Sequence, residues 1–128
     1  MAAGDIKTLY RFSGVRDGVT ASWTVGTAVM CSNHTGQPID ARIRIYGAAG
    51  TLYANVSFTI EPNATYTAVT RPIPAYQANR NLGLGAVSQG MGVVQSSHEG
   101  LVCSAQVVDA EALPPTFMSG LNMERFER

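Results

Sequence analysis

The chain has two cysteines, Cys31 and Cys103, and each occupies an inward position of a segment in which apolar and polar residues alternate. An alternation of this kind is typical of a β-strand with one buried face and one wet face. Two inward cysteines on two such strands predict a single disulfide that joins them. Because the cross-link would span 72 residues (103 minus 31), the chain-entropy model gives it a stabilisation of about 4 kcal/mol.

Two other interpretations of the cysteines stay open. As free thiols, they would be small buried hydrophobic residues of a cytosolic protein. As thiolates, Cys31 and Cys103 would bind zinc together with His34 and His98, which lie three residues after the first cysteine and five before the second. Neither half of that set has the spacing of a recognised zinc knuckle, and inward cysteines leave little room for a metal.

Alternating segments recur along most of the chain, and no segment has a convincing helical period. Residues 51–60 give the longest run, with apolar side chains on one face and Thr, Tyr, Asn and Ser on the other. The pattern predicts strands at residues 6–12, 22–31, 40–46, 51–60, 64–70, 86–96, 101–109 and 121–126. In the second of these strands, Trp23 shares a face with Cys31.

Turn residues separate these segments. Residues 73–85 are polar and irregular, so we expect a surface loop that crosses between two sheets. Gly90 and Gly92 interrupt the strand at 86–96, which indicates a bulge or a close approach by another segment. Seven or eight strands at this spacing predict an all-β fold, a single antiparallel β-sandwich domain over residues 1–128 with Greek-key connections.

Composition excludes several classes of partner. With 128 residues the chain suits one domain, and its nine Lys and Arg balance its nine Asp and Glu. Nothing in that balance attracts nucleic acid, and no apolar run approaches the roughly 20 residues that span a membrane. Residues 1–5 lack the features of a signal peptide, so we expect that a signal was removed before the Met1 start.

No residue pattern predicts catalysis or a cofactor. His34, His98 and Glu99 do not stand at a recognised spacing from Ser97 or Asp40, and the chain has no Gly-x-Ser-x-Gly motif. We therefore expect a protein that is not an enzyme.

Four short stretches carry a resemblance to a known group of proteins. They are VMCSNHTGQP at 29–38, RIRIY at 42–46, GTL at 50–52 and IEPNAT at 60–65. Together with the strand that holds Cys103, this pattern over residues 25–70 resembles bacterial secreted immunoglobulin-like domains. The resemblance implies an immunoglobulin-like fold and an extracellular, cell-surface or periplasmic location, and it carries no active-site residues. Cys103 falls on a late strand, so its pairing need not follow that of antibody domains.

Outward side chains near the Gly47–Gly50 turn are the candidate binding residues. Tyr46 and Tyr53 flank this turn, and Arg42 and Arg44 point to the same side as Tyr46. Exposed aromatic rings stack on sugars, and Tyr with Arg is also enriched at protein interfaces. The simpler alternative is that these pairs only cover a wet sheet face.

A shortage of charge favours assembly. Lys7 is the only lysine, whereas sheet proteins usually protect open edges with Lys or Pro. The tail at 117–128 carries Phe117, Met118, Leu121, Met123 and Phe126, and it either packs into a larger object or folds back on its own domain. The sequence thus predicts a non-enzymatic structural or interaction subunit of an extracellular or cell-surface assembly, bound to itself or to another protein; a carbohydrate-binding module is the alternative.

Three asparagines stand in N-glycosylation sequons, namely Asn33, Asn55 and Asn63. Asn33 and Asn63 fall in expected turns, where asparagine is common for conformational reasons alone.

Overall fold

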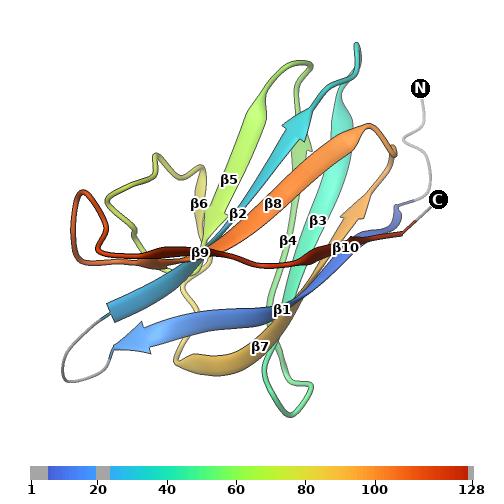
Figure 1. Cartoon of the computed structure of the whole chain (residues 1–128). Helices are drawn as coiled ribbons and strands as arrows, with labels where there is room; N and C mark the ends of the chain where they lie inside the picture. The colour runs from blue at the N-terminus through green and yellow to red at the C-terminus, as the bar shows by residue number, and fades with distance from the viewer. Residues whose placement is uncertain (1–5, 20–23, 127–128) are drawn as a thin grey trace.

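The computed structural model describes residues 6–19 and 24–126, and these form strands and loops without any helix (Figure 1). The all-β class is therefore correct. The strands are β1 (Lys7–Val19), β2 (Thr24–Asn33), β3 (Ile39–Tyr46), β4 (Leu52–Ile60), β5 (Thr65–Val69), β6 (Arg80–Asn81), β7 (Val87–Ser96), β8 (Leu101–Asp109), β9 (Met118–Gly120) and β10 (Met123–Arg125). The described part of the chain thus has ten strands rather than seven or eight, because β6 and β9 are too short to leave a pattern, whereas β10 lies within the strand expected at 121–126. Trp23 lies outside the described residues.

The strands make one curled sheet with two halves. One half has the order β4-β3-β7-β1-β10 and the other β6-β5-β2-β8-β9. Strand β1 connects them, since most of it pairs with β7 while its end, Gly18 and Val19, pairs with β2 (Figure 1). A curled sheet joined in this way differs from the expected pair of separate antiparallel sheets.

The expectation of antiparallel pairing throughout is wrong at one place. Strand β6 runs parallel to β5, with Ala68 opposite Arg80 and Val69 opposite Asn81. A parallel pair requires a crossover connection, and residues 70–79 supply it. This loop also covers part of the second half, where Ile73 is buried with Val69.

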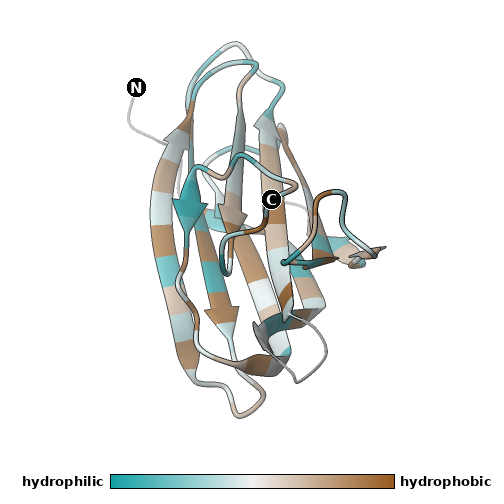
Figure 2. Cartoon of the chain, turned by 90° about the vertical axis from the view of Figure 1, so that its left-hand side faces the viewer, coloured by the Kyte–Doolittle hydropathy of each residue, from teal (hydrophilic) through white to brown (hydrophobic). Residues whose placement is uncertain are grey.

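Both halves bury side chains in one core. Alternation is strict in β3, whose odd-numbered residues are buried while the even-numbered ones are half-buried. Figure 2 shows the same alternation as bands of brown and of paler or teal colour along the strands. The core contains Leu9, Phe12, Ile43 and Val94 from the first half and Val29, Cys31, Ala68 and Ala105 from the second.

Gly92 explains the glycine-rich pattern of β7. The ring of Phe12 lies directly over it, so a side chain at position 92 would overlap that ring. The expected close approach to this strand is confirmed, and the register between β1 and β7 shifts at three places nearby.

The tail folds back on its own domain, which was one of the two interpretations. Leu121 and Met123 pack against the core, and β10 pairs with β1. Phe117 and Met118, in contrast, are 39% and 50% exposed. Both halves of the tail therefore fold back on the domain, the first through pairing of β9 with β8 and the second through β10, although Phe117 and Met118 stay partly exposed.

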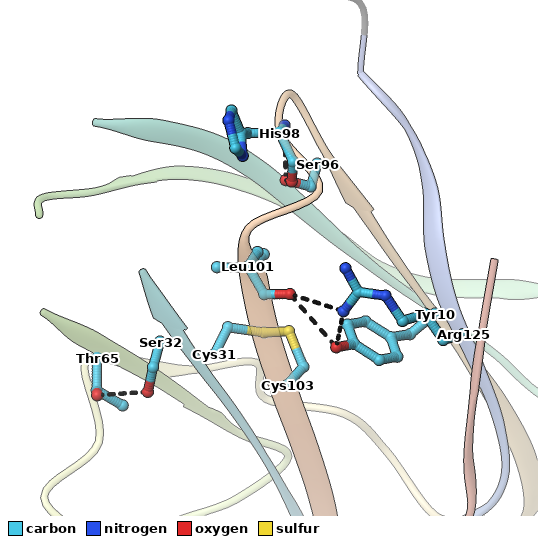
Figure 3. Close-up of a disulfide and its surroundings, with 9 residues drawn as sticks. All are labelled: Tyr10, Cys31, Ser32, Thr65, Ser96, His98, Leu101, Cys103 and Arg125. Atoms are coloured by element: carbon cyan, nitrogen blue, oxygen red, sulfur yellow. Dashed lines mark hydrogen bonds between the residues drawn. A yellow bond between two sulfur atoms is a disulfide. The ribbon is translucent and has the colours of Figure 1, made fainter. Parts of the chain in front are cut away.

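Cys31 and Cys103 form the expected disulfide (Figure 3). They lie directly opposite each other on β2 and β8, with their Cα atoms 4.1 Å apart, and both side chains are buried in the core. The bond thus joins neighbouring strands of one half of the sheet. It excludes the free-thiol interpretation for this structure.

We predict that replacing Cys31 and Cys103 together with alanine lowers the free energy of unfolding by about 4 kcal/mol, because the unfolded chain regains the freedom of a 72-residue closure. Urea denaturation measures the change. Intact mass of the wild type before and after reduction provides the control and should rise by the mass of two hydrogens. Equal urea midpoints for the wild type and the double variant would contradict this prediction.

Candidate interaction surface

Three of the four predicted binding residues, Arg42, Arg44 and Tyr46, lie on one side of the β4-β3-β7 sheet, because they alternate along β3. Asn55 of β4 stands opposite Arg44, and Tyr53 lies at a register shift beside Tyr46, where Leu52 is the residue opposite that tyrosine. We call this side of the sheet the outer face. It comprises Arg42, Arg44 and Tyr46 of β3, Asn55 and Ser57 of β4, and Met91, Val93 and Gln95 of β7, with Tyr53 at its margin.

The two arginines of the outer face differ in their contacts. Arg42 donates from Nε to Ser57 Oγ and from Nη1 to Gln95 Oε1, both at 3.3 Å, and so links three strands. Arg44 has its Nε buried, yet no described residue offers that atom an acceptor. An unpaired buried donor costs roughly 1–3 kcal/mol.

Apolar side chains surround one end of the outer face. The Tyr53 ring lies against Gly47, where any side chain would overlap it, and this support leaves the tyrosine 48% exposed. Met91 of β7 is opposite Tyr46 and is 39% exposed. The outer face therefore combines an unpaired cation with exposed aromatic and thioether groups.

A shallow hollow of about 510 Å³ adjoins this end of the outer face. Its lining includes Ser13, Arg16, Gly47, Gln89 and Met91. The backbone of the β3–β4 turn forms part of it, so the hollow extends the exposed surface beside Tyr53.

The zinc alternative is wrong because the two sulfur atoms are bonded to each other. The loops beside the cysteines do meet, since a side chain at Gly100 would touch both Thr35 and His98. His98 Nδ1 accepts a hydrogen bond from Gly100 N at 2.8 Å, which gives this imidazole a role in the turn. Among the residues that the structure describes, no group of three or more His, Cys, Asp or Glu is arranged to hold a metal ion.

Asn33, the first residue of a sequon, has a structural role. Its side chain is buried, and Nδ2 donates to the carbonyl oxygens of Gln37 and Ile60 at 2.8 and 2.9 Å. Its Oδ1 accepts from both the backbone and the hydroxyl of Thr35. Asn33 therefore fixes the turn between β2 and β3 to the end of β4.

We predict that Asn33→Ala lowers the free energy of unfolding by roughly 2–4 kcal/mol, because buried carbonyl and amide groups lose their partners. Thermal and urea unfolding measure this. Asn63→Gly is the matched control, since residue 63 has a φ of 63°, which glycine adopts freely, and its stability should stay near that of the wild type. A cost for Asn33→Ala no larger than that of the control would refute the structural role.

A second polar group is buried where β1 crosses between the halves. Asp17 Oδ1 accepts hydrogen bonds from Thr70 Oγ1 at 3.0 Å and from Arg71 Nε at 2.8 Å. Its Oδ2 is buried without a partner among the described residues. Burial raises the pKa of Asp17 above its ordinary value of 3.8, although Thr70 and Arg71 act in the opposite direction.

This pKa shift predicts a pH dependence of stability. Because the folded state holds a proton on Asp17 at pH values where the unfolded state has released it, the contribution of Asp17 falls as pH rises from about 3.8 through the folded-state pKa. The difference in unfolding free energy between wild type and Asp17→Asn should therefore decrease over that range and then level off. Asp40→Asn, at an exposed hydrogen bond to Thr59, corrects for the general change in charge. An increase with pH would contradict the prediction.

No protein-family model matches the chain, and no curated protein matches its sequence. A solved structure, that of Thermotoga maritima 1070, has a similar fold with a TM-score of 0.55 and 9% sequence identity. The match covers 99% of this chain and 100% of that one. At this identity the similarity concerns the fold alone, and it extends over the entire length of both chains.

No helix that could cross a membrane occurs in residues 6–19 and 24–126.

Proposed function

We propose that the protein is a non-enzymatic interaction subunit of an extracellular or cell-surface assembly, and that the outer face contacts a partner protein. The observation that carries this proposal is the buried Nε of Arg44, which has no acceptor among the described residues. Arginine presents a planar fork of donors that matches a carboxylate. A partner with an acidic side chain at this point would pair with the guanidinium group of this half-buried arginine, which no carboxylate of the described chain neutralises.

The neighbours of Arg44 support a protein partner. Tyr46 and Met91 stand opposite each other beside it, and Tyr53 is exposed on the adjacent strand. Tyr, Met and Arg are enriched in protein interfaces, where apolar contact surrounds a few polar anchors. The outer face thus has the composition of an interface centre with a charged anchor.

The disulfide supports the location. Cross-links of this kind persist in oxidising compartments such as the cell exterior and the periplasm. We extend the proposal to an exported domain of immunoglobulin-like sandwich type, as the resemblance over residues 25–70 implies. The larger hydrophobic cluster, to which both halves of the sheet contribute, is compatible with such a domain.

A carbohydrate-binding module is the second candidate, and the position of Tyr53 favours it. The ring is 48% exposed and lies against Gly47, a residue that also lines the hollow of about 510 Å³. Sugar rings stack on aromatic faces presented in this way.

We predict that acidic peptides bind the protein and that Arg44→Met weakens this binding by roughly ten- to a hundredfold, the value of a charge-assisted hydrogen bond. The probes are immobilised Asp- and Glu-rich peptides and an array of neutral and carboxylated glycans. Arg80→Met is the matched control, because it removes an exposed arginine from the other half of the sheet.

The outcomes separate the candidates. Peptide binding that Arg44→Met weakens and Arg80→Met does not would support the protein interface. Binding to glycans alone, lost on Tyr53→Ala, would replace it with the carbohydrate module. Equal effects of Arg44→Met and Arg80→Met, or no binding to any probe, would refute the proposed role of the outer face.

A further inference from the structure

Most edges of this sheet are short. Strands β6, β9 and β10 contain two, three and three residues, and each lies at an end of the strand order. Short edge strands offer few free backbone groups to another chain. At these places the fold limits pairing with a neighbouring molecule.

The longer strands next to these short ones are covered by specific hydrogen bonds. The carbonyl of Leu101 in β8 accepts from Tyr10 Oη at 3.3 Å and from Arg125 Nη1 at 3.4 Å (Figure 3). Farther along β8, Leu121 N donates to the carbonyl of Ala105. In β5, Asn79 bonds both the N–H and the carbonyl of Thr67. These four backbone groups on β8 and β5 therefore have partners within the chain.

Strand β4 is different. It has nine residues, pairs only with β3 in the described chain, and contains neither a charged residue nor a proline. Its inward residues Ala54, Val56 and Phe58 remain half-buried, while the β3 residues opposite them are fully buried. A long, neutral, apolar edge of this kind is a template for pairing with another strand.

The inward side of β4 also forms the open margin of the core. Phe58 stacks on Tyr66 of β5 with ring centroids 3.9 Å apart, so the two halves of the sheet touch here through half-buried rings. A strand added beside β4 would cover the exposed parts of Val56 and Phe58. Apolar burial and backbone hydrogen bonds would both favour the addition.

We propose that β4 pairs antiparallel with β4 of a second copy about a two-fold axis at Val56. This proposal rests on the proposed function of the protein as an assembly subunit. The sequence of β4 is complementary to itself in this register. On the inward side Ala54 faces Phe58 of the other copy and Val56 faces its own equivalent, so that small and large side chains alternate. On the outer side Asn55 faces Ser57 and Tyr53 faces Thr59, and no charges oppose each other.

Like charges introduced on both sides of the two-fold axis test this register. In Asn55→Lys/Ser57→Lys, each new lysine faces a lysine of the other copy, and Asn55→Asp/Ser57→Asp places carboxylates in the same way. We expect wild type to have twice the 13.6 kDa mass of the chain in light scattering, and each double variant to dimerise roughly tenfold or more weakly. An equimolar mixture of the two variants should recover the dimer, because every lysine then faces an aspartate.

Val102→Lys/Ser104→Lys is the matched control. These exposed residues of β8 have the same spacing and add the same charge on a strand that, unlike β4, has a neighbouring strand on each side, β2 and β9. The control should dimerise like the wild type, and circular dichroism should show that every variant is folded.

The possible failures are distinguishable. A wild-type assembly that persists in both charged variants, or a mixture that stays monomeric, would overturn the β4 pairing while peptide binding at the outer face could still stand. A wild type that is monomeric at all concentrations would overturn the pairing as well. If Arg44→Met and Arg80→Met affect peptide binding equally, while the mixture of the lysine and aspartate variants recovers the dimer, only the function proposed for the outer face would be overturned.

Discussion

The ladder between β2 and β8 is the contact on which the rest of the fold depends. It runs from Val25 opposite Asp109 to Asn33 opposite Leu101, and the disulfide between Cys31 and Cys103 lies within it. Every other strand of that half of the sheet is attached to one of these two strands or to a neighbour. Because the cross-link keeps the pair together in the unfolded chain, the residues that must find each other across 72 positions begin already joined.

The long strand β1 determines which surfaces remain available. It enters beside β7 and ends beside β2, so it fastens the two halves to each other along one margin. The partly buried ion pair between Asp17 and Arg71 ties that crossing to the segment just after β5. The opposite margin, at β4 and β5, is held by side chains such as the Phe58–Tyr66 stack rather than by backbone pairing. Closure on one side therefore leaves β4 as the long edge on the other.

Residue pattern predicted the parts of the fold that have one wet face. Alternation located β3 and β4 to within about a residue, and it placed Arg42, Arg44 and Tyr46 on one face of β3; it could not foresee the register shift beside Tyr53. It could not locate β6, because two residues carry no period, nor could it foresee that β6 runs parallel to β5. Asp17 was missed because register shifts in β1 disrupt the alternation around it. Asn33 was read as a turn residue, since only the folded chain brings it to the carbonyl of Ile60.

The outer face and the β4 edge reinforce each other if the proposed pairing holds. Joining two copies through β4 makes one continuous sheet, with both outer faces on the same side. One row of side chains then crosses both copies of that sheet. It runs from Arg44 to Asn55 in one copy and continues with Ser57 and Arg42 of the other. The unpaired guanidinium groups of both copies then lie on a single surface related by the two-fold axis. A partner with two acidic groups at a matching spacing would engage both at once, and the second contact would form at high effective concentration. Assembly through β4 would thus convert a weak single anchor into a bivalent one.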